Sequence, residues 1–98
     1  MFKSDVKIDE QELLKECEFI VGLVSYKNRL YGDSFFLLRE FCGRRYFTSR
    51  LFEKIMRYEN LERKDIEKSI DTLNDIIGYC LLELTYINKK EDKSNGGV

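Results

Sequence analysis

IEKSIDTLNDIIGYCLLEL, residues 66–84, has the apolar spacing of an amphipathic helix. At about 100° per residue, six aliphatic residues fall within one narrow sector, as a helix face toward a core requires. These residues are Ile66, Ile70, Leu73, Ile77, Leu81 and Leu84. The pattern predicts a long helix that begins just after the link at residues 60–63 and ends near Ile87.

An acidic stripe occupies another side of the same predicted helix. Glu67, Asp71 and Asp75 follow one another at i, i+4 spacing, in a sector shared with Gly78 and Leu82. Like charges at this spacing repel by a few tenths of a kcal/mol per pair, so a cation shared between them would stabilise the helix. We therefore predict Glu67, Asp71 and Asp75 as ligands of Mg²⁺, and Gly78 as a point where a neighbour approaches closely.

The alternative is an ordinary solvated helix face. The macrodipole favours acids in the first turns, and Lys64 and Lys68 could pair with Glu67 and Asp71. Asp75 lies too far into the helix for the dipole to explain, and an apolar run follows it. We therefore expect Asp75 to be half-buried.

Size and composition restrict the fold. The chain has 98 residues, of which 43% are hydrophobic and 36% charged, with a net charge of −1. One domain of this length buries roughly 60 to 65% of its unfolded surface, which favours oligomerisation into a homodimer or homotetramer. The absence of proline permits long helices and argues against a turn-rich β fold. We predict a small all-α bundle of two long and two shorter helices.

Cysteine usage and hydropathy exclude several classes of protein. Cys17, Cys42 and Cys80 are widely spaced and the chain has no histidine, which argues against a zinc site or a Cys/His nucleophile. No apolar stretch approaches the ~20 residues that cross a bilayer, so we expect no membrane association and a cytoplasmic location. One short basic row on an acidic chain also disfavours nucleic acid as a partner.

Asp9 and Glu12 form the signature of a helix start, and the helix is expected to run to about Arg29. Leu13, Cys17, Ile20 and Val24 mark its core side. Glu12 and Glu16 fall in a separate sector, from which they could complete a carboxylate cage with the acidic stripe. Their alternative position is the solvated surface.

Two shorter helices are predicted between the long ones. The first follows the turn at residues 32–33 and extends to about Phe41, and the second spans about residues 49–58. In the second helix Arg50, Lys54 and Arg57 form a basic row that suits phosphate, or a solvated face partly neutralised by nearby acids. Residues 1–8 are interpreted as a lead-in, residues 9–88 as one domain, and residues 89–98 as a flexible tail.

Three motifs together resemble a known family. KNRLYGDSF (residues 27–35), RLFEKIMRYENL (residues 50–61) and E-x3-DTLNDIIGYCLLEL (residues 67–84) are similar, in order and spacing, to the nucleotide modification-associated domain of phages. That domain is related to the MazG-like all-α nucleotide pyrophosphohydrolases. The resemblance covers residues 26–86 and implies a helical bundle, within a dimer or tetramer, in which carboxylates hold Mg²⁺ against the phosphates of a nucleotide.

The resemblance also implies roles for individual residues. Glu67, Asp71 and Asp75 look like metal ligands, with Asp71 and Asp75 the residues on which catalysis would depend. Phosphate contacts are expected from Lys27, Arg50, Lys54 and Arg57. Tyr31, Gly32 and Asp33 would shape the mouth of the pocket.

One departure from the family pattern bears on catalysis. MazG-like enzymes carry E-E-x-x-E on the first helix, where this chain has only Glu12 and Glu16 at a usable spacing. The favoured hypothesis is a Mg²⁺-dependent pyrophosphohydrolase acting on a free nucleotide, modified or unmodified. The first alternative is a non-catalytic phage protein that sequesters a nucleotide signal of host defence. The second is a helical module for protein interaction.

Overall fold

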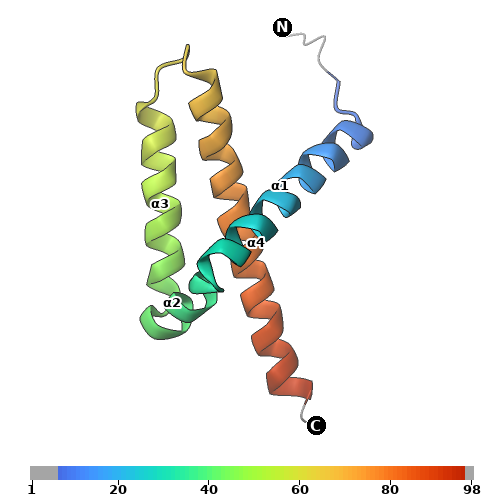
Figure 1. The fold of residues 1–98 in the computed structure, drawn as a ribbon, viewed down its shortest axis with the longest axis vertical. Coiled ribbons are helices and arrows are strands. Elements are labelled where there is room, and N and C mark those ends of the chain that lie inside the picture. The colour runs from blue at the N-terminus through green and yellow to red at the C-terminus, as the bar shows by residue number, and fades with distance from the viewer. Residues whose placement is uncertain (1–6, 97–98) are drawn as a thin grey trace, which may run out of the picture.

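The computed structural model describes residues 7–96, which form four α-helices and no strand (Figure 1). The helices are α1 (Glu10–Tyr31), α2 (Ser34–Cys42), α3 (Arg44–Asn60) and α4 (Ile66–Gly96). The prediction of an all-α bundle with two long and two shorter helices is confirmed. Within the described range, none of the helices is both long and apolar enough to cross a membrane.

The ends of α1 follow from local side-chain chemistry. Asp9 caps the N-terminus, where its carboxylate accepts a hydrogen bond from the backbone N–H of Gln11 at 2.9 Å. At the other end Gly32 has φ 59° and Asp33 has φ 60°, both in the left-handed region. The Asn28 side chain donates a hydrogen bond to the Asp33 carboxylate. This contact stabilises a conformation that residues other than glycine rarely adopt.

The helix boundaries differ from the predicted ones at two places. Gly43 alone turns the chain between α2 and α3, with φ 77° and its N–H bonded to the Arg39 carbonyl, so α3 begins at Arg44 instead of near Ser49. α4 continues to Gly96, past the Ile87 expected as its end, and so covers most of the predicted tail. Residues 1–6 of the predicted lead-in and residues 97–98 of the tail lie outside the described range.

Aromatic packing holds α2 against α3 and α4. α3 and α4 lie side by side as an antiparallel hairpin, and α2 lies across its lower end (Figure 1). Phe35 of α2 is only 4% exposed, and its ring centroid lies 5.5 Å from that of Tyr46 and 6.1 Å from that of Tyr79. Among the described residues, the buried apolar side chains are Phe35 and Ile20 of α1.

A buried ion pair also joins α2 to α4. The Arg39 guanidinium donates to both carboxylate oxygens of Glu83, at 2.8 and 3.1 Å, and the two side chains are 11% and 9% exposed. Arg39 also lies over the ring of Tyr86, 4.5 Å from its centroid. The Glu83 carboxylate raises the pKa of Arg39, so this cation stays charged.

α1 crosses α4 at Gly78. A Cβ atom built on Gly78 would lie 3.0 Å from Cγ2 of Val24, closer than side chains normally pack. The prediction of a close neighbour at Gly78 is therefore confirmed, and that neighbour is α1. Gly22, two residues before Val24 in α1, has nothing within 4 Å of the equivalent position.

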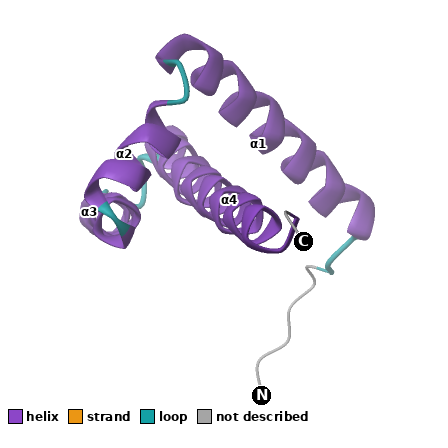
Figure 2. Ribbon diagram, turned by 90° about the horizontal axis from the view of Figure 1, so that it is seen from below, coloured by secondary structure: helices purple, strands orange, loops and turns teal. Residues whose placement is uncertain are grey.

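The expected core face of α4 points away from the bundle. Five of its six aliphatic residues are 41% to 64% exposed, and the buried polar residues of the helix lie outside this stripe: Thr72, Asn74 and Glu83. In the end-on view of Figure 2, α2 and α3 lie on one side of α4 and α1 on another, and no helix covers the remaining side. The prediction that this stripe faces a core within the chain is wrong, because the partners of α4 in α2 and α3 contact its mixed aromatic and polar side.

A pair of glycine substitutions should separate close packing from helix propensity. Gly78→Leu should lower the free energy of unfolding by about 1 to 3 kcal/mol, because the larger side chain pushes α1 away from α4. Gly22→Ala should raise it by up to about 1 kcal/mol, since nothing opposes the gain in helix propensity. Urea denaturation measures both values. A stabilising Gly78→Leu substitution would contradict the crossing.

A second pair of substitutions tests the buried ion pair. Glu83→Gln should lower the free energy of unfolding by about 3 kcal/mol, because it leaves the Arg39 charge buried without its partner. The control is Glu62→Gln in the exposed pair with Lys64, which should change stability by less than about 0.5 kcal/mol. Equal effects in urea denaturation would show that the Arg39–Glu83 pair is not structurally important.

Candidate functional site

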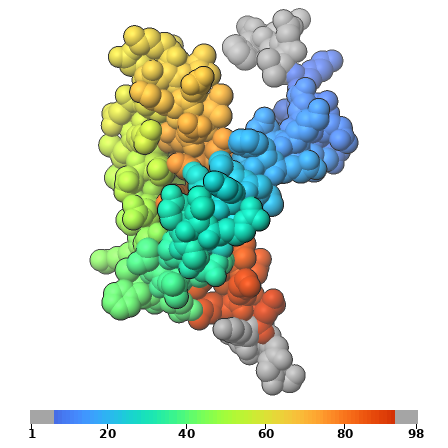
Figure 3. Space-filling model, in the orientation of Figure 1, coloured from blue at the N-terminus to red at the C-terminus, as the bar shows by residue number. Residues whose placement is uncertain are grey.

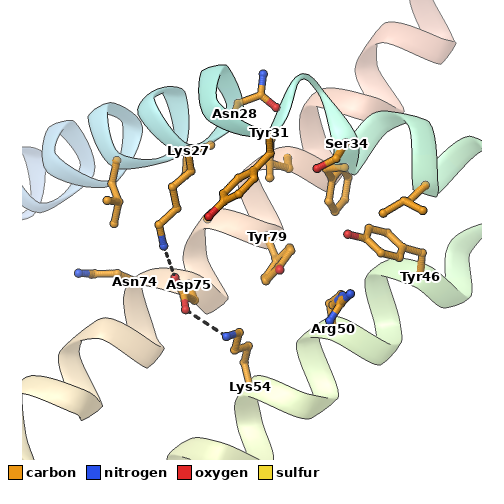
Figure 4. A pocket seen from close by; sticks show the side chains of 16 residues that line it. Lys27, Asn28, Tyr31, Ser34, Tyr46, Arg50, Lys54, Asn74, Asp75 and Tyr79 are labelled. Carbon is orange, nitrogen blue, oxygen red and sulfur yellow. Dashed lines mark hydrogen bonds and ion pairs between the residues drawn. The ribbon is translucent and has the colours of Figure 1, made fainter.

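Side chains from all four helices line a pocket of about 470 Å³ (Figure 4). This volume falls within the range of small-molecule sites. The polar and aromatic residues of its lining are Lys27, Asn28, Tyr31, Ser34, Phe35, Tyr46, Arg50, Lys54, Asn74, Asp75 and Tyr79. The aliphatic residues Leu23, Val24, Leu38 and Leu82 and the glycine of the α1–α4 crossing complete it.

Helical periodicity explains how the pocket walls are built. On α3, Tyr46, Arg50 and Lys54 recur every four residues and therefore share one face. On α4, Asp75 and Tyr79 have the same spacing. The close contact at Gly78 brings the C-terminal half of α1 down to these residues, so that the wall contributed by α1 faces those of α3 and α4.

Asp75 lies between two lysines from different helices. Its Oδ1 atom is 3.0 Å from Nζ of Lys27 and its Oδ2 atom is 3.2 Å from Nζ of Lys54 (Figure 4). The Asp75 side chain is 25% exposed and that of Lys54 is 20% exposed, as expected for a half-buried carboxylate. With Arg50, the pocket lining contains three cations and one acid. The excess of positive charge favours an anionic ligand.

Tyrosines flank the cationic side of the pocket. The Arg50 guanidinium lies 5.5 Å from the centroid of the Tyr46 ring, and interaction with the Tyr46 hydroxyl raises the pKa of Arg50. Glu53, at 3.6 Å from Arg50, is itself 65% exposed and neutralises it weakly. Burial raises the pKa of Tyr79, so its phenol stays neutral and can act as a donor at neutral pH.

Several predicted site residues come together in this pocket. Lys27, Tyr31, Arg50 and Lys54, all predicted to contact a nucleotide, are part of its lining, as is the predicted metal ligand Asp75.

Gly32 and Asp33 act indirectly. They form the left-handed turn that places Tyr31 at the end of α1 and Ser34 at the start of α2, beside the pocket.

The remaining predicted residues lie elsewhere. Arg57 is exposed on α3 and is not part of the pocket lining, and the same holds for Glu67 and Asp71 on α4. Glu12 and Glu16 are exposed near the start of α1, where they line a separate shallow hollow. At 1.5 Å per residue, Glu12 lies about 22 Å along α1 from the end that carries the pocket lysine.

These positions bear on the predicted Mg²⁺ site. Within the described residues, no three or more His, Cys, Asp or Glu side chains are grouped as a metal centre would require. The carboxylate that does enter the pocket, that of Asp75, is already engaged by two ammonium groups. The arrangement within one chain does not fit the predicted cage of Glu67, Asp71 and Asp75 with Glu12 and Glu16, and Mg²⁺ binding stays a prediction.

Sequence reasoning missed part of the pocket. Phe35, Tyr46, Asn74 and Tyr79 line it, but none was predicted as a site residue. For the two tyrosines a signal was present, because each lies four residues from a predicted charged residue on the same helix. Phe35 carried no such signal, since an aromatic residue on an apolar helix face usually belongs to the core.

Comparisons with protein-family models, with curated proteins and with solved structures found no match to this chain. The resemblance to the nucleotide modification-associated domain therefore stays a prediction.

Substitution of Asp75 distinguishes an anion site from a metal site. Asp75→Asn should raise the affinity for pyrophosphate, without Mg²⁺, by about 3- to 10-fold, because the anion no longer competes with the carboxylate for Lys27 and Lys54. Isothermal titration calorimetry measures the change. The control, Asp71→Asn, alters an exposed acid one turn away and should have no effect. Weaker binding of pyrophosphate in both variants, seen only with Mg²⁺ present, would instead favour the predicted metal site.

Proposed function

We propose that this protein binds a free nucleotide in the pocket between its four helices. The observation that carries the proposal is the convergence of three cationic side chains, Lys27, Arg50 and Lys54, on one pocket that aromatic rings also line. The cationic side chains suit the phosphates of a nucleotide, and the aromatic rings suit its base. A phosphorylated aromatic molecule of nucleotide size matches both the lining and the volume.

The proposed orientation of the ligand follows from where each group lies. The two lysines and Asp75 occupy one side of the pocket, Tyr46 lies with Arg50 at the other side, and Tyr79 lies between the two groups (Figure 4). The phosphates would displace the Asp75 carboxylate from the lysines, and the base would lie against the tyrosines. A cytoplasmic location, where free nucleotides are abundant, fits this proposal.

The geometry favours binding without hydrolysis. Asp75 is held between two lysines, where it balances their charge, and among the described residues it is not grouped with other acids that could hold a metal. A protein that sequesters a nucleotide signal needs only the cations and rings. The other candidate, release of pyrophosphate by Mg²⁺-dependent hydrolysis, requires a group of carboxylates, which a second copy of the chain would have to complete.

A thermal-shift panel tests the proposal. Nucleoside triphosphates, nucleoside monophosphates and cyclic dinucleotides are each added with Mg²⁺ and with EDTA, and every stabilising ligand is recovered by chromatography. We expect at least one ligand to raise Tm in EDTA and to be recovered intact. A ligand recovered as a monophosphate and pyrophosphate, only with Mg²⁺, would indicate the enzyme. A flat panel would contradict nucleotide binding.

Two arginines of α3 provide a matched pair for the same test. Arg50→Ala should weaken binding of the stabilising nucleotide by about 10- to 100-fold, because it removes a charged hydrogen-bond donor from the pocket. Arg57→Ala removes the same side chain from the exposed part of the helix and should leave the affinity unchanged. Equal losses in both variants would place the phosphates on the outer face of α3.

A further inference from the structure

The uncovered face of α4 has the repeat of a coiled-coil seam. Its apolar residues follow one another at alternating steps of four and three residues through three heptads. They are Ile66, Ile70, Leu73, Ile77, Cys80, Leu84 and Ile87. At 1.5 Å per residue this seam is about 32 Å long. Ile66, the most exposed member, is 64% exposed, and Ile87 at the other end is 39% exposed.

The protomer leaves more apolar surface uncovered than a small stable domain normally does. Two apolar side chains are fully buried in the described residues, and the seam is not the only uncovered surface. The N-terminal half of α1 projects beyond the other helices (Figure 3), and its Leu13 and Phe19 are 55% and 58% exposed. These apolar side chains are exposed whenever the protomer is folded. A partner that is always present at the same concentration as the chain covers them best.

We propose that a second copy of the chain covers the seam, with the two α4 helices antiparallel about a twofold axis at Ile77. A helix with the same repeat and length is what the seam requires, and α4 is such a helix. The seam is also nearly symmetric about Ile77, since Ile70 and Leu84 each lie seven residues away from it. Antiparallel pairing therefore sets Ile70 against Leu84 of the second copy.

The charges beside the seam support the antiparallel direction. Of the positions that border it, Glu67, Glu83 and Lys90 carry charge. Glu83 is held by Arg39 inside the protomer, and Lys90 contacts Glu40. Both are thus paired within the protomer, and Glu67 is the remaining charge beside the seam. Parallel pairing would set the two Glu67 side chains at the same level, whereas antiparallel pairing places them at opposite ends of the seam. Antiparallel pairing also opposes the two helix dipoles.

The mass of the unaltered protein in solution gives the first test. Light scattering after size-exclusion chromatography should give twice the 11.7 kDa mass of the chain. Ile77→Glu should raise the dimer dissociation constant at least 100-fold, because two carboxylates would face each other at the axis. Leu37→Glu, at a 66% exposed position of α2 away from the seam, should leave the dimer intact. A monomeric unaltered protein, or a folded dimeric Ile77→Glu variant, would overturn the proposal.

A double substitution tests the direction of pairing. In the antiparallel dimer, Ile70→Glu with Leu84→Lys places opposite charges face to face, whereas Ile70→Glu with Leu84→Glu places like charges there. The first variant should stay dimeric at concentrations that dissociate the second. Equal dissociation of both would overturn the antiparallel arrangement.

If the Ile77→Glu variant loses its helical circular dichroism spectrum, thiol reactivity of the unaltered protein tests the dimer instead. Cys80 lies in the seam, and its reaction with a maleimide should slow as the protein concentration rises through the dissociation constant. Cys42, exposed on α2, provides the internal reference. A Cys80 rate that does not depend on concentration would overturn the proposal.

Discussion

The arrangement of the helices depends on the close contact between α1 and α4 at Gly78. Because the glycine has no side chain, Val24 reaches the backbone of α4, and α1 lies near enough for Lys27 to contact Asp75. Lys27 follows Val24 by three residues and Asp75 precedes Gly78 by three, so one crossing point places both ends of this ion pair. With a larger residue at position 78, α1 would lie farther from α4, and the pocket would lose the wall that α1 contributes.

α4 serves different purposes on its opposite sides. One side carries Asp75 and Tyr79, which line the pocket, and Glu83, which binds Arg39 of α2. The other side carries aliphatic residues that the chain leaves exposed. A helix of this kind cannot be placed from hydrophobicity alone, because its most apolar face is not the face that the chain itself covers.

The four helices and several site residues could be predicted from the sequence because they depend on local patterns. Apolar spacing predicted α1 and α4, and the acidic N-cap predicted the start of α1. The basic row at i, i+4 spacing predicted Arg50 and Lys54 as site residues, and both line the pocket. The side of α4 that faces the bundle could not be predicted, since it depends on pairings such as Arg39 with Glu83, which lie 44 residues apart. For the same reason the acids of α1 and α4 were grouped in the prediction but lie apart in the structure.

Phe35 is both a core residue and part of the pocket wall. Its ring contacts Tyr46 and Tyr79, so the same aromatic cluster that joins α2 to α3 and α4 forms one boundary of the pocket. Any molecule that fills the pocket adds contacts to this cluster and enlarges a core that is otherwise small. Folding and occupancy are then thermodynamically linked, and substitutions that loosen the protomer would be tolerated best in cells where the ligand is abundant.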